Sequence, residues 1–572
     1  MSDSTRRLRS SAWFTGPEYY NFARRAWMRS QGFSHDVFED RPIIGICNSW
    51  SELNNCHAGL KDVAQAVKRG VTRAGGVALE FPVISLGEML MKPTAMQFRN
   101  LMSMDVEECI RANPLDGVVL LGGCDKTVPA MIMGAASANI PSAVVTTGPM
   151  LAGVWRRQSL GSGTDGRKLF DLYRAGKLSD EELDEVEGCI ARTAGHCTVM
   201  GTASTMACVA EALGMTLPGC ASIPAPDARR LALAEETGQR IVSMVDEQLT
   251  PARVITRESL ENAVTAVMAL GGSTNAVVHL LAIAGRLGIP LTLEDFDRIS
   301  RRTPYLVNLK PSGSYVMEDF FAAGGLAAAL RRIPDLLHRE CITVSGGTLG
   351  QNIESAVCFD DDVIRPADQP LSPEGGIAVL RGNLCPRGAL IKQSAATPGL
   401  LVHTGPAYVF EDHEEMLAKI DSEDLPVDRN SVLVMKNGGP KGAPGFPEWG
   451  QIPMPRKLLR QGITDMVRVS DSRMSGTSFG TVVLHVAPES AAGGPLAQVQ
   501  TGDPIELNVP ARTLTLQVSD RLLDDRRAQC KPDRKYYTRG YGRLFVDHVT
   551  QADEGCDFDF LRAADSSSTA ER

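Results

Sequence analysis

Between residues 40 and 370, short apolar runs alternate with stretches of helical period, and this alternation constrains the fold more than any other feature of the sequence. It is typical of α/β proteins, in which helices connect the strands of a mainly parallel sheet. Clear instances are the strand-like runs 41–50, 115–123 and 141–148 and the helix-like stretches 60–71 and 258–270.

The later part of the chain has a different pattern, with short strands separated by Gly and Pro turns. Leu514, Leu516 and Val518, for example, fall on one face because side chains alternate along a strand. A chain of 572 residues is also too long for one ordinary core. We therefore predict an α/β domain over 1–375 and a β-barrel-like domain over 376–572.

The overall charge limits the kinds of partner. The net charge of −9 and the pI near 5.6 argue against nucleic acid or an anionic membrane surface, since both need a basic face. The sequence begins without the apolar core of a signal peptide, and its apolar runs are too short to span a bilayer. We therefore expect a cytoplasmic protein whose thirteen cysteines are buried thiols or metal ligands rather than disulfides. Only the tail 564–572 is predicted to be disordered.

Three reactive side chains adjoin one another within the segment 116–138. The run DGVVLLGG predicts a buried strand that ends in a turn, and Pro129 can occupy the first turn of the helix that follows. Cys124, Asp125 and Lys126 therefore lie between the carboxyl end of a strand and the start of a helix. Open α/β sheets place their ligands at this position, so the segment is a candidate site.

Two further cysteines have a similar setting. Cys56 and Cys197 each precede or begin a predicted helix, as Cys124 does. Backbone N–H groups and the helix dipole favour an anion there, so we expect the pKa of these thiols to be lowered and a cluster of iron and thiolates to be stabilised. The alternative is that each is an ordinary buried cysteine. Because the spacing contains no C-x-x-C motif, the thiols alone do not decide between the two.

Acidic residues in loops rich in Gly and Pro form a second group of candidates. Glu88, Asp125 and Glu448 lie in such segments, and carboxylate oxygens suit Mg²⁺. Taken alone, Glu88 and Glu448 are more easily interpreted as solvated surface acids.

Two glycine-rich stretches resemble functional motifs. The stretch 161–166 matches G-x-G-x-x-G, but the residues before it do not form a buried strand, so we reject it as a dinucleotide site. The stretch 469–480 places Ser475 and Thr477 between glycines, which as a bare motif predicts only a turn.

Together, these segments resemble the dihydroxy-acid and sugar-acid dehydratase family, the iron–sulfur dehydratases that include phosphogluconate dehydratase. The resemblance covers most of the chain. It is carried, in order, by NNCHAGL, GGCDKTVPA, HCTVMGTASTM, LGGSTNAVVHL, VSGGTLGQN, GGPKGAPGFPE and VSDSRMSGTSFGTVVLHVAPE.

The resemblance implies a role for each candidate residue. It implies an iron–sulfur cluster bound by Cys56, Cys124 and Cys197. It implies Mg²⁺ surrounded by Glu88, Asp125, Glu448 and a carbamylated Lys126. Ser475 would be the base, and Thr477 would orient the site. The family fold, an α/β domain followed by a β-barrel-like domain with the active site between them, agrees with the change of pattern along the chain.

The implied reaction explains why Cys124 adjoins Asp125 and Lys126. Three cysteines, one fewer than a cluster usually has, leave one iron with an open position that can act as a Lewis acid. Iron would then carry off the C3 hydroxyl of a 2,3-dihydroxy acid, while Mg²⁺ stabilises the charge that develops as the C2 proton leaves. A free ammonium at Lys126 would repel both cations, whereas a carbamate would add an anionic oxygen ligand.

The segment 79–111 resembles the sugar-acid branch of the family, typified by arabinonate and xylonate dehydratases, rather than the branched-chain amino-acid branch. This resemblance implies a hydro-lyase with a [2Fe-2S] cluster, which converts a pentonate to a 2-keto-3-deoxy acid. It also implies that the protein is a homodimer or homotetramer. One alternative is dihydroxy-acid dehydratase of valine and isoleucine synthesis. The other is a non-catalytic iron–sulfur carrier, although electron transfer does not need the acids, the lysine and the serine.

Overall fold

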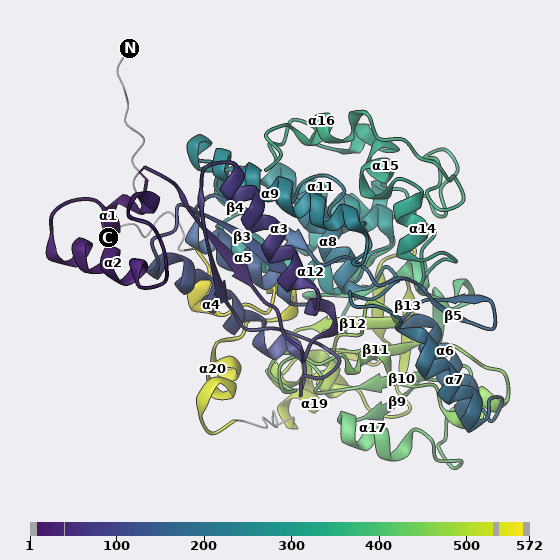
Figure 1. Cartoon of the computed structure of the whole chain (residues 1–572). Helices are drawn as coiled ribbons and strands as arrows, with labels where there is room; N and C mark the ends of the chain where they lie inside the picture. The colour runs from purple at the N-terminus through teal and green to yellow at the C-terminus, as the bar shows by residue number, and fades with distance from the viewer. Residues whose placement is uncertain (1–7, 39, 530–536, 564–572) are drawn as a thin grey trace.

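The computed structural model describes residues 8–38, 40–529 and 537–563. It confirms the predicted fold class, because a parallel sheet with helices lies in the N-terminal part and a nearly closed, barrel-like sheet lies in the C-terminal part (Figure 1). The domain boundary near residue 375 stays a prediction. The tail 564–572, which we predicted to be disordered, lies outside the described residues. No helix within the described ranges combines the length and apolar character needed to cross a membrane.

The N-terminal sheet consists of β1 (Ile43–Asn48), β2 (Val77–Pro82), β3 (Gly117–Gly122) and β4 (Ser142–Thr146). Its order is β2-β1-β3-β4, and every neighbouring pair is parallel. β1, β3 and β4 are buried along their whole length, as expected for parallel strands that are covered on both faces. The chain passes from β1 to β2 on one side and then to β3 on the other. The carboxyl ends of β1 and β3 therefore form the switch point at which open α/β sheets bind ligands.

Helices cover both faces of this sheet. α3 (Leu60–Arg73) and α9 (Ala228–Glu247) pack together over one face, and α4 (Arg99–Ala112) and α5 (Thr127–Ala138) pack over the other. The helix-like stretches 60–71 and 258–270 are confirmed in α3 and α11. The remaining elements of this part are α1 (Ser11–Phe14), α2 (Tyr19–Arg29), β5 (Gly153–Trp155), β6 (Gln158–Leu160), α6 (Thr164–Arg174), α7 (Asp180–Ile190), α8 (Thr202–Ala212), α10 (Pro251–Val254), α11 (Arg257–Leu270), α12 (Asn275–Arg286), α13 (Leu293–Arg302), α14 (Met317–Ala322), α15 (Gly325–Arg331) and α16 (Leu349–Glu354).

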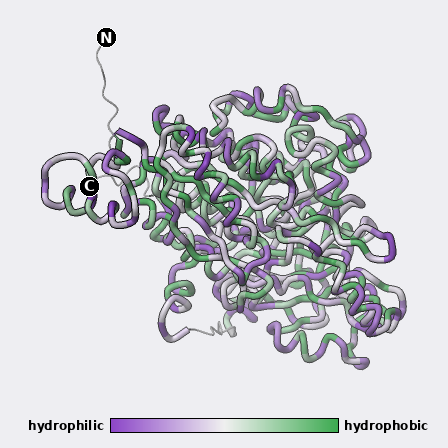
Figure 2. The backbone as a smooth tube through the Cα atoms, viewed as in Figure 1, coloured by the Kyte–Doolittle hydropathy of each residue, from purple (hydrophilic) through white to green (hydrophobic). Residues whose placement is uncertain are grey.

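The helices α8, α11 and α12 form the centre of the molecule. Nearly all of their residues are buried, and they share one large hydrophobic core with the N-terminal sheet. Hydrophobic stretches accordingly run through the interior of the backbone trace (Figure 2). The start of α8 and the start of α12 both face the C-terminal part, where the candidate site lies.

The C-terminal sheet has eight strands in the order β14-β13-β9-β10-β11-β12-β8-β7. The strands from β9 to β12 run parallel, and the outer pairs are antiparallel. Their bounds are β7 (Ala378–Leu380), β8 (Gly388–Ile391), β9 (Val402–Phe410), β10 (Val432–Met435), β11 (Arg468–Ser470), β12 (Val482–Ala487), β13 (Pro504–Asn508) and β14 (Thr513–Leu516).

Backbone hydrogen bonds at Arg381 join the two ends of this sheet. The Arg381 N–H donates to the Arg512 carbonyl over 2.9 Å, and the Leu514 N–H donates to the Arg381 carbonyl over 2.8 Å. The barrel is therefore nearly closed. Leu514 and Leu516 lie in its hydrophobic interior and Val518 packs against it, so the predicted shared face is confirmed.

The alternation that we expected throughout the barrel holds for β13 and β14 but not for β10 and β12, which are buried on both faces. The reason is that a second hydrophobic cluster covers the outside of β10. In that cluster Leu433 and Met435 pack with Met416 of α17 (His413–Lys419) and Leu458 of α18 (Arg456–Arg460). Strands buried on both faces are apolar at nearly every position, and His485 in β12 is the exception here.

The C-terminal segment returns to the N-terminal part after α19 (Asp520–Gln529) and α20 (Gly540–His548). The Arg99 guanidinium donates to the carbonyls of Gly555 and Cys556 over 2.9 and 2.8 Å. Arg286 and Asp557 form a fully buried ion pair at 2.6 Å. This segment therefore ties the barrel to helices α4 and α12.

Candidate active site

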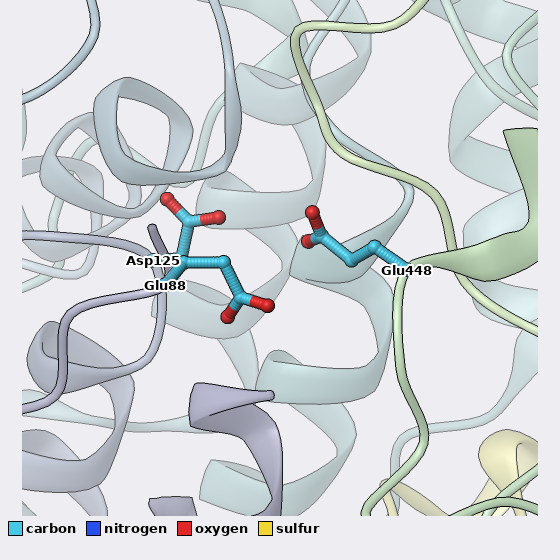
Figure 3. A group of neighbouring side chains, drawn as sticks. All are labelled: Glu88, Asp125 and Glu448. Carbon is cyan, nitrogen blue, oxygen red and sulfur yellow. The ribbon is translucent and has the colours of Figure 1, made fainter. Parts of the chain in front are cut away.

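Three carboxylates converge between the two parts of the molecule (Figure 3). Glu88 lies in the loop after β2, Asp125 in the loop after β3, and Glu448 in the loop after β10. Each offers one oxygen, and these three oxygens all lie within 4.8 Å of one another. The structure thus brings together the three acids that the sequence analysis selected.

The ammonium of Lys126 lies among these carboxylates. Its side chain is fully buried, and Nζ lies 2.9 Å from Glu88, 3.2 Å from Asp125 and 3.1 Å from Glu448. Burial opposes the charged form of Lys126, but Glu448 and Glu88 outweigh it and raise the pKa of the ammonium above its ordinary value. In the metal-free protein Lys126 is therefore a cation that offsets the charge of the three acids.

The ionisation of the acids reflects the same balance. Burial raises the pKa of Asp125 despite the nearby Lys126. Burial also opposes ionisation of Glu448, but Lys126 and Arg473 overcome it and lower the pKa of that carboxyl. At neutral pH the group thus holds an anionic Glu448 next to two cations.

The donor set fits a hard divalent cation. Carboxylate oxygens are the ligands that Mg²⁺ takes in proteins, and three of them converge here. Glu88 Oε2 is buried and accepts no hydrogen bond, although it lies 2.9 Å from Lys126 Nζ. That oxygen therefore has a lone pair that a cation can use.

The three selected thiols lie along the same edge of the N-terminal sheet. Cys56 follows β1 and Cys124 follows β3, so both occupy the switch point of the sheet. Cys56 and Cys124 contact each other through their side chains, and Cys197 is close enough to Cys124 and Asp125 for their charges to affect its pKa. The thiols and the acidic group are therefore neighbours.

The expectation of lowered thiol pKa values is wrong for two of these residues. Contact with Cys124, together with burial, raises the pKa of Cys56 well above its ordinary value. Burial, reinforced by Asp125, raises the pKa of Cys197 to about 12. The dipole of a helix acts mainly within its first turn, and α3 and α8 begin only at Leu60 and Thr202. These thiols would ionise only beside a bound cation.

His57 is a site residue that the sequence analysis missed. It adjoins Cys56, it is fully buried, and its Nε2 accepts a hydrogen bond from the Gly123 N–H over 3.1 Å. Burial lowers the pKa of His57 to about 4, so the ring is neutral at physiological pH. Because Gly123 precedes Cys124, His57 holds the loops of two thiols together.

The serine loop lies between β11 and β12 and reaches into the N-terminal part. Ser475 Oγ lies 3.0 Å from Thr477 Oγ1, and the Thr164 hydroxyl donates to the Thr477 carbonyl over 2.7 Å. At Gly476 a Cβ would lie 2.5 Å from the backbone nitrogen of Thr202, so only glycine allows this close approach. The loop is thus docked against the start of α8.

Two further residues that the sequence analysis missed connect the serine loop to the acids. Arg473 donates to Glu448 over 3.0 Å and to Thr94 over 3.3 Å, and the Thr94 hydroxyl donates to Glu88 over 2.8 Å. Asn275 donates to Glu448 over 3.2 Å and to the carbonyl of Met474 over 3.1 Å. Both lie inside segments that carry the family resemblance, and that location was the available signal.

The glycine stretch 161–166, which we rejected as a dinucleotide site, has a different use. Gly163 adopts a left-handed backbone with φ of 79° and lies against the side chain of Thr477. A Cβ there would lie 2.5 Å from Thr477 Oγ1. The stretch therefore supports the serine loop.

Comparison with known proteins shows extended similarity. Residues 41–352 match the family described as dihydroxy-acid/6-phosphogluconate dehydratase N-terminal, and residues 362–556 match its C-terminal counterpart. The chain is 53% identical to L-arabonate dehydratase of Azospirillum brasilense, over 98% of each chain. It is 51% identical to L-arabinonate dehydratase of Rhizobium leguminosarum bv. trifolii, over 97% of this chain and 96% of the other. It is 48% identical to 6-deoxy-6-sulfo-D-gluconate dehydratase of Pseudomonas putida, over 98% and 97%.

Replacing Lys126 tests the balance of charge. In metal-free protein, Lys126→Met should lower the free energy of unfolding by about 3 kcal/mol near neutral pH, because it leaves three half-buried acids short of a cation. The pKa of Glu448 is lowered in the folded state, so this stabilisation is present above the ordinary pKa of a glutamate and is lost as the pH falls. The penalty should therefore shrink in acid. Urea denaturation in EDTA measures it.

The exposed Lys177→Met serves as the control and should leave the free energy of unfolding unchanged. Equal stability of Lys126→Met and wild type near neutral pH would show that the Lys126 ammonium does not stabilise the metal-free site.

Proposed function

The chain belongs to the dihydroxy-acid/6-phosphogluconate dehydratase family, and we propose that within it the protein is a sugar-acid dehydratase that acts on a pentonate such as arabinonate or xylonate. Members of this family are dehydratases, so the protein is a hydro-lyase. In the proposed reaction, water leaves a 2,3-dihydroxy acid and the 2-keto-3-deoxy acid is released.

One observation carries this proposal. Three carboxylates, three thiols and a loop with a serine hydroxyl, all far apart in the sequence, meet at the interface between the two parts of the molecule. Dehydration of a 2,3-dihydroxy acid needs a base for the C2 proton and electrophiles for the oxygens. The interface offers ligands for both electrophiles beside a hydroxyl.

We propose that the thiols of Cys56, Cys124 and Cys197 hold a [2Fe-2S] cluster. Their burial beside one another supports this, because the raised pKa values of Cys56 and Cys197 mean that positive metal ions are needed to keep them as thiolates. Likewise, the oxygens of Glu88, Asp125 and Glu448 would hold Mg²⁺. When bound, the two groups would supply Lewis acidity for the departing hydroxide and for the charge that develops next to C2.

The residues of the serine loop would handle the proton. We propose that Ser475 Oγ takes the C2 proton as an alkoxide, which a cation held by the neighbouring carboxylates would stabilise, and that Thr477, whose hydroxyl lies 3.0 Å away, fixes its direction. Thr164 and Asn275 hold the two sides of the loop through its backbone carbonyls. A base held in this way can act repeatedly in one geometry.

Lys126 is proposed to be carbamylated in the active enzyme. Its Nζ now occupies the space between the carboxylates, where a cation would have to bind. Addition of the neutral amine to CO₂ with loss of a proton gives an N-carboxylate. The positive charge is thereby replaced by an anionic oxygen ligand.

The relatives support a hydroxylated substrate. Two proteins at 51% and 53% identity are named for arabinonate, and one at 48% is named for a sulfogluconate. The alternative substrate is the apolar dihydroxy acid of branched-chain amino-acid synthesis, which the family description also covers. A non-catalytic iron–sulfur carrier would leave the convergence of three acids and a serine without a purpose.

We also propose that the protein is a homo-oligomer. Tyr19, Tyr20, Phe22 and Trp27 are 60–74% exposed on α2, which projects from the body of the molecule (Figure 1). Four such side chains can bury roughly 600 Å² per copy, close to what one partner contributes to a standard interface. Aromatic residues are enriched at such interfaces, and a second copy is the partner that we propose for this face.

The thiol assignment predicts loss of iron. Cys56→Ser, Cys124→Ser and Cys197→Ser should each abolish the visible absorption and lower the iron content, since each removes a proposed ligand. Cys109→Ser is the control, because this half-buried thiol contacts Asp105 on α4 away from the site. Equal loss of iron in the control would refute the assignment.

The proposed activity is tested by the product formed in D₂O. A pentonate should give a 2-keto-3-deoxy acid with deuterium at C3, because the enol formed by dehydration takes its proton from solvent. Ser475→Ala should lower kcat by about 10²- to 10⁴-fold with iron retained, and Thr477→Ala should have a smaller effect. Mass spectrometry and a keto-acid assay measure both.

Dihydroxy-isovalerate is the matched comparison substrate. It should have a much lower kcat/KM, because a pocket built for sugar hydroxyls is left with unpaired polar groups by an apolar tail. A higher kcat/KM for dihydroxy-isovalerate would instead establish the alternative substrate.

Negatively charged side chains introduced on α2 should dissociate the proposed oligomer. Tyr20→Asp with Trp27→Asp should convert the oligomer to a monomer in light scattering, because it buries charge in the aromatic face. Arg24→Asp, an exposed position on the same helix, is the control. An unchanged mass for the double variant would show that α2 is not the interface.

A further inference from the structure

The loop that carries Glu448 begins at Gly438 and has little secondary structure of its own before the short helical turn at Trp449–Gln451. Two buried acids, Asp471 and Glu489, lie beneath its first residues. Neither has been given a role in the proposed reaction. Buried carboxylates are costly, so their contacts need an explanation.

Glu489 binds the backbone of the loop. Its Oε2 accepts hydrogen bonds from the N–H groups of Lys441 and Gly442, both over 2.9 Å. Asp471 accepts from the Gly438 N–H over 2.8 Å. At Gly439 a Cβ would lie 2.3 Å from Glu489 Oε2, so the backbone and the carboxylate are in close contact.

Gln551 of the C-terminal segment completes the environment of Glu489. Its amide nitrogen donates to Glu489 Oε1 over 2.6 Å, and its amide oxygen accepts the Glu489 N–H over 2.9 Å. The adjoining residues are held in turn by Arg99 through the carbonyls of Gly555 and Cys556. Glu489 thus links the loop that carries Glu448 to the C-terminal segment, which in turn ties the two parts of the molecule together.

The carboxyl groups of the two acids are satisfied by hydrogen bonds rather than by ion pairs. Neither forms an ion pair within the described part of the chain. Burial raises the pKa of both, that of Glu489 to about 7 with a contribution from Asp471. A buried network whose members are hydrogen-bonded makes the segments that it joins rigid.

We propose that Glu489 is a positioning residue for the metal site: it anchors the start of the loop at Lys441 and Gly442 and so sets where Glu448 stands relative to Glu88 and Asp125. The far end of the loop is fixed separately, because Arg473 donates to the Phe446 carbonyl over 2.8 Å and to Glu448. Because both ends of the loop are held, the carboxylate of Glu448 has one position relative to Glu88 and Asp125. This inference rests on the proposed Mg²⁺ site.

The chemistry of the contacts gives a matched test. The carboxylate of Glu489 accepts hydrogen bonds from the loop N–H groups on one side and from the NH₂ of Gln551 on the other. A glutamine at this position has only one acceptor oxygen, so its own NH₂ must point toward one of these two sets of donors. Either choice places two donors against each other. Exchanging the pair, as Glu489→Gln with Gln551→Glu, again places an acceptor against the loop N–H groups at their 2.9 Å contacts and pairs a donor with an acceptor between positions 489 and 551.

The experiment measures metal binding directly, with Mn²⁺ as an EPR-visible substitute for Mg²⁺. Glu489→Gln should raise the Kd for Mn²⁺ by about 10-fold, the lower end of what loss of a direct outer contact to a metal ligand costs, because Glu489 acts through the loop; the iron content should be unchanged. The exchanged pair should return the Kd to within a few-fold of wild type. Glu506→Gln is the control, because Glu506 accepts from Gln517 over 2.6 Å in a similar pair on β13, away from the loop.

Each outcome is decisive. A wild-type Kd in Glu489→Gln, or a folded exchanged pair that stays weak, would overturn the positioning role while leaving the metal site intact. If Glu489→Gln does not fold, the exchanged pair provides the test of the positioning role. Recovery of both folding and Mn²⁺ affinity in that pair would support the role. Failure of wild type to bind Mn²⁺, or binding unaffected by Glu88→Gln, would instead overturn the proposed metal site and this inference with it.

Discussion

The mutual repulsion of three carboxylates is the constraint on which the rest of this structure depends. Glu88 and Asp125 belong to the N-terminal part and Glu448 to the barrel part, and a buried ammonium at Lys126 lies between them. Removing charges from water is costly unless each has a partner. Within the N-terminal part Lys126 faces two acids, whereas Glu448 of the barrel part lies 3.0 Å from Arg473 of the same part and 3.1 Å from Lys126. The ion pair between Lys126 and Glu448 therefore joins the two parts of the molecule at the site.

Features set by neighbouring residues could be predicted from the sequence. The position of Cys124, Asp125 and Lys126 follows from a strand, a glycine turn and a helix that are contiguous in the chain. The shared face of Leu514 and Leu516 follows from the period of a strand. The burial of β10 on both faces was missed although its four residues are all apolar, because the helices that cover its outer face, α17 and α18, lie elsewhere in the chain.

Features set by distant residues were missed or wrong. Thr94 and Arg473 form a hydrogen bond although they are separated by 379 positions, and nothing in a single sequence pairs them. The pKa of Cys197 was misjudged because helix position is local, whereas burial and the nearby Asp125 depend on the whole fold. A sequence pattern can thus locate a reactive group, but its protonation depends on what packs around it.

Closure of the barrel at Arg381 has a consequence for aggregation. A strand at the end of a sheet presents unpaired N–H and C=O groups, and these can recruit a strand from another molecule. In the described part of this barrel, β7 and β14 are the terminal strands, and their backbone groups meet each other at Arg381, Arg512 and Leu514. The backbone groups of the barrel's terminal strands are thereby less available for pairing with a strand of another molecule. Contacts between molecules are left to side chains, whose chemistry can be selective where backbone pairing is not.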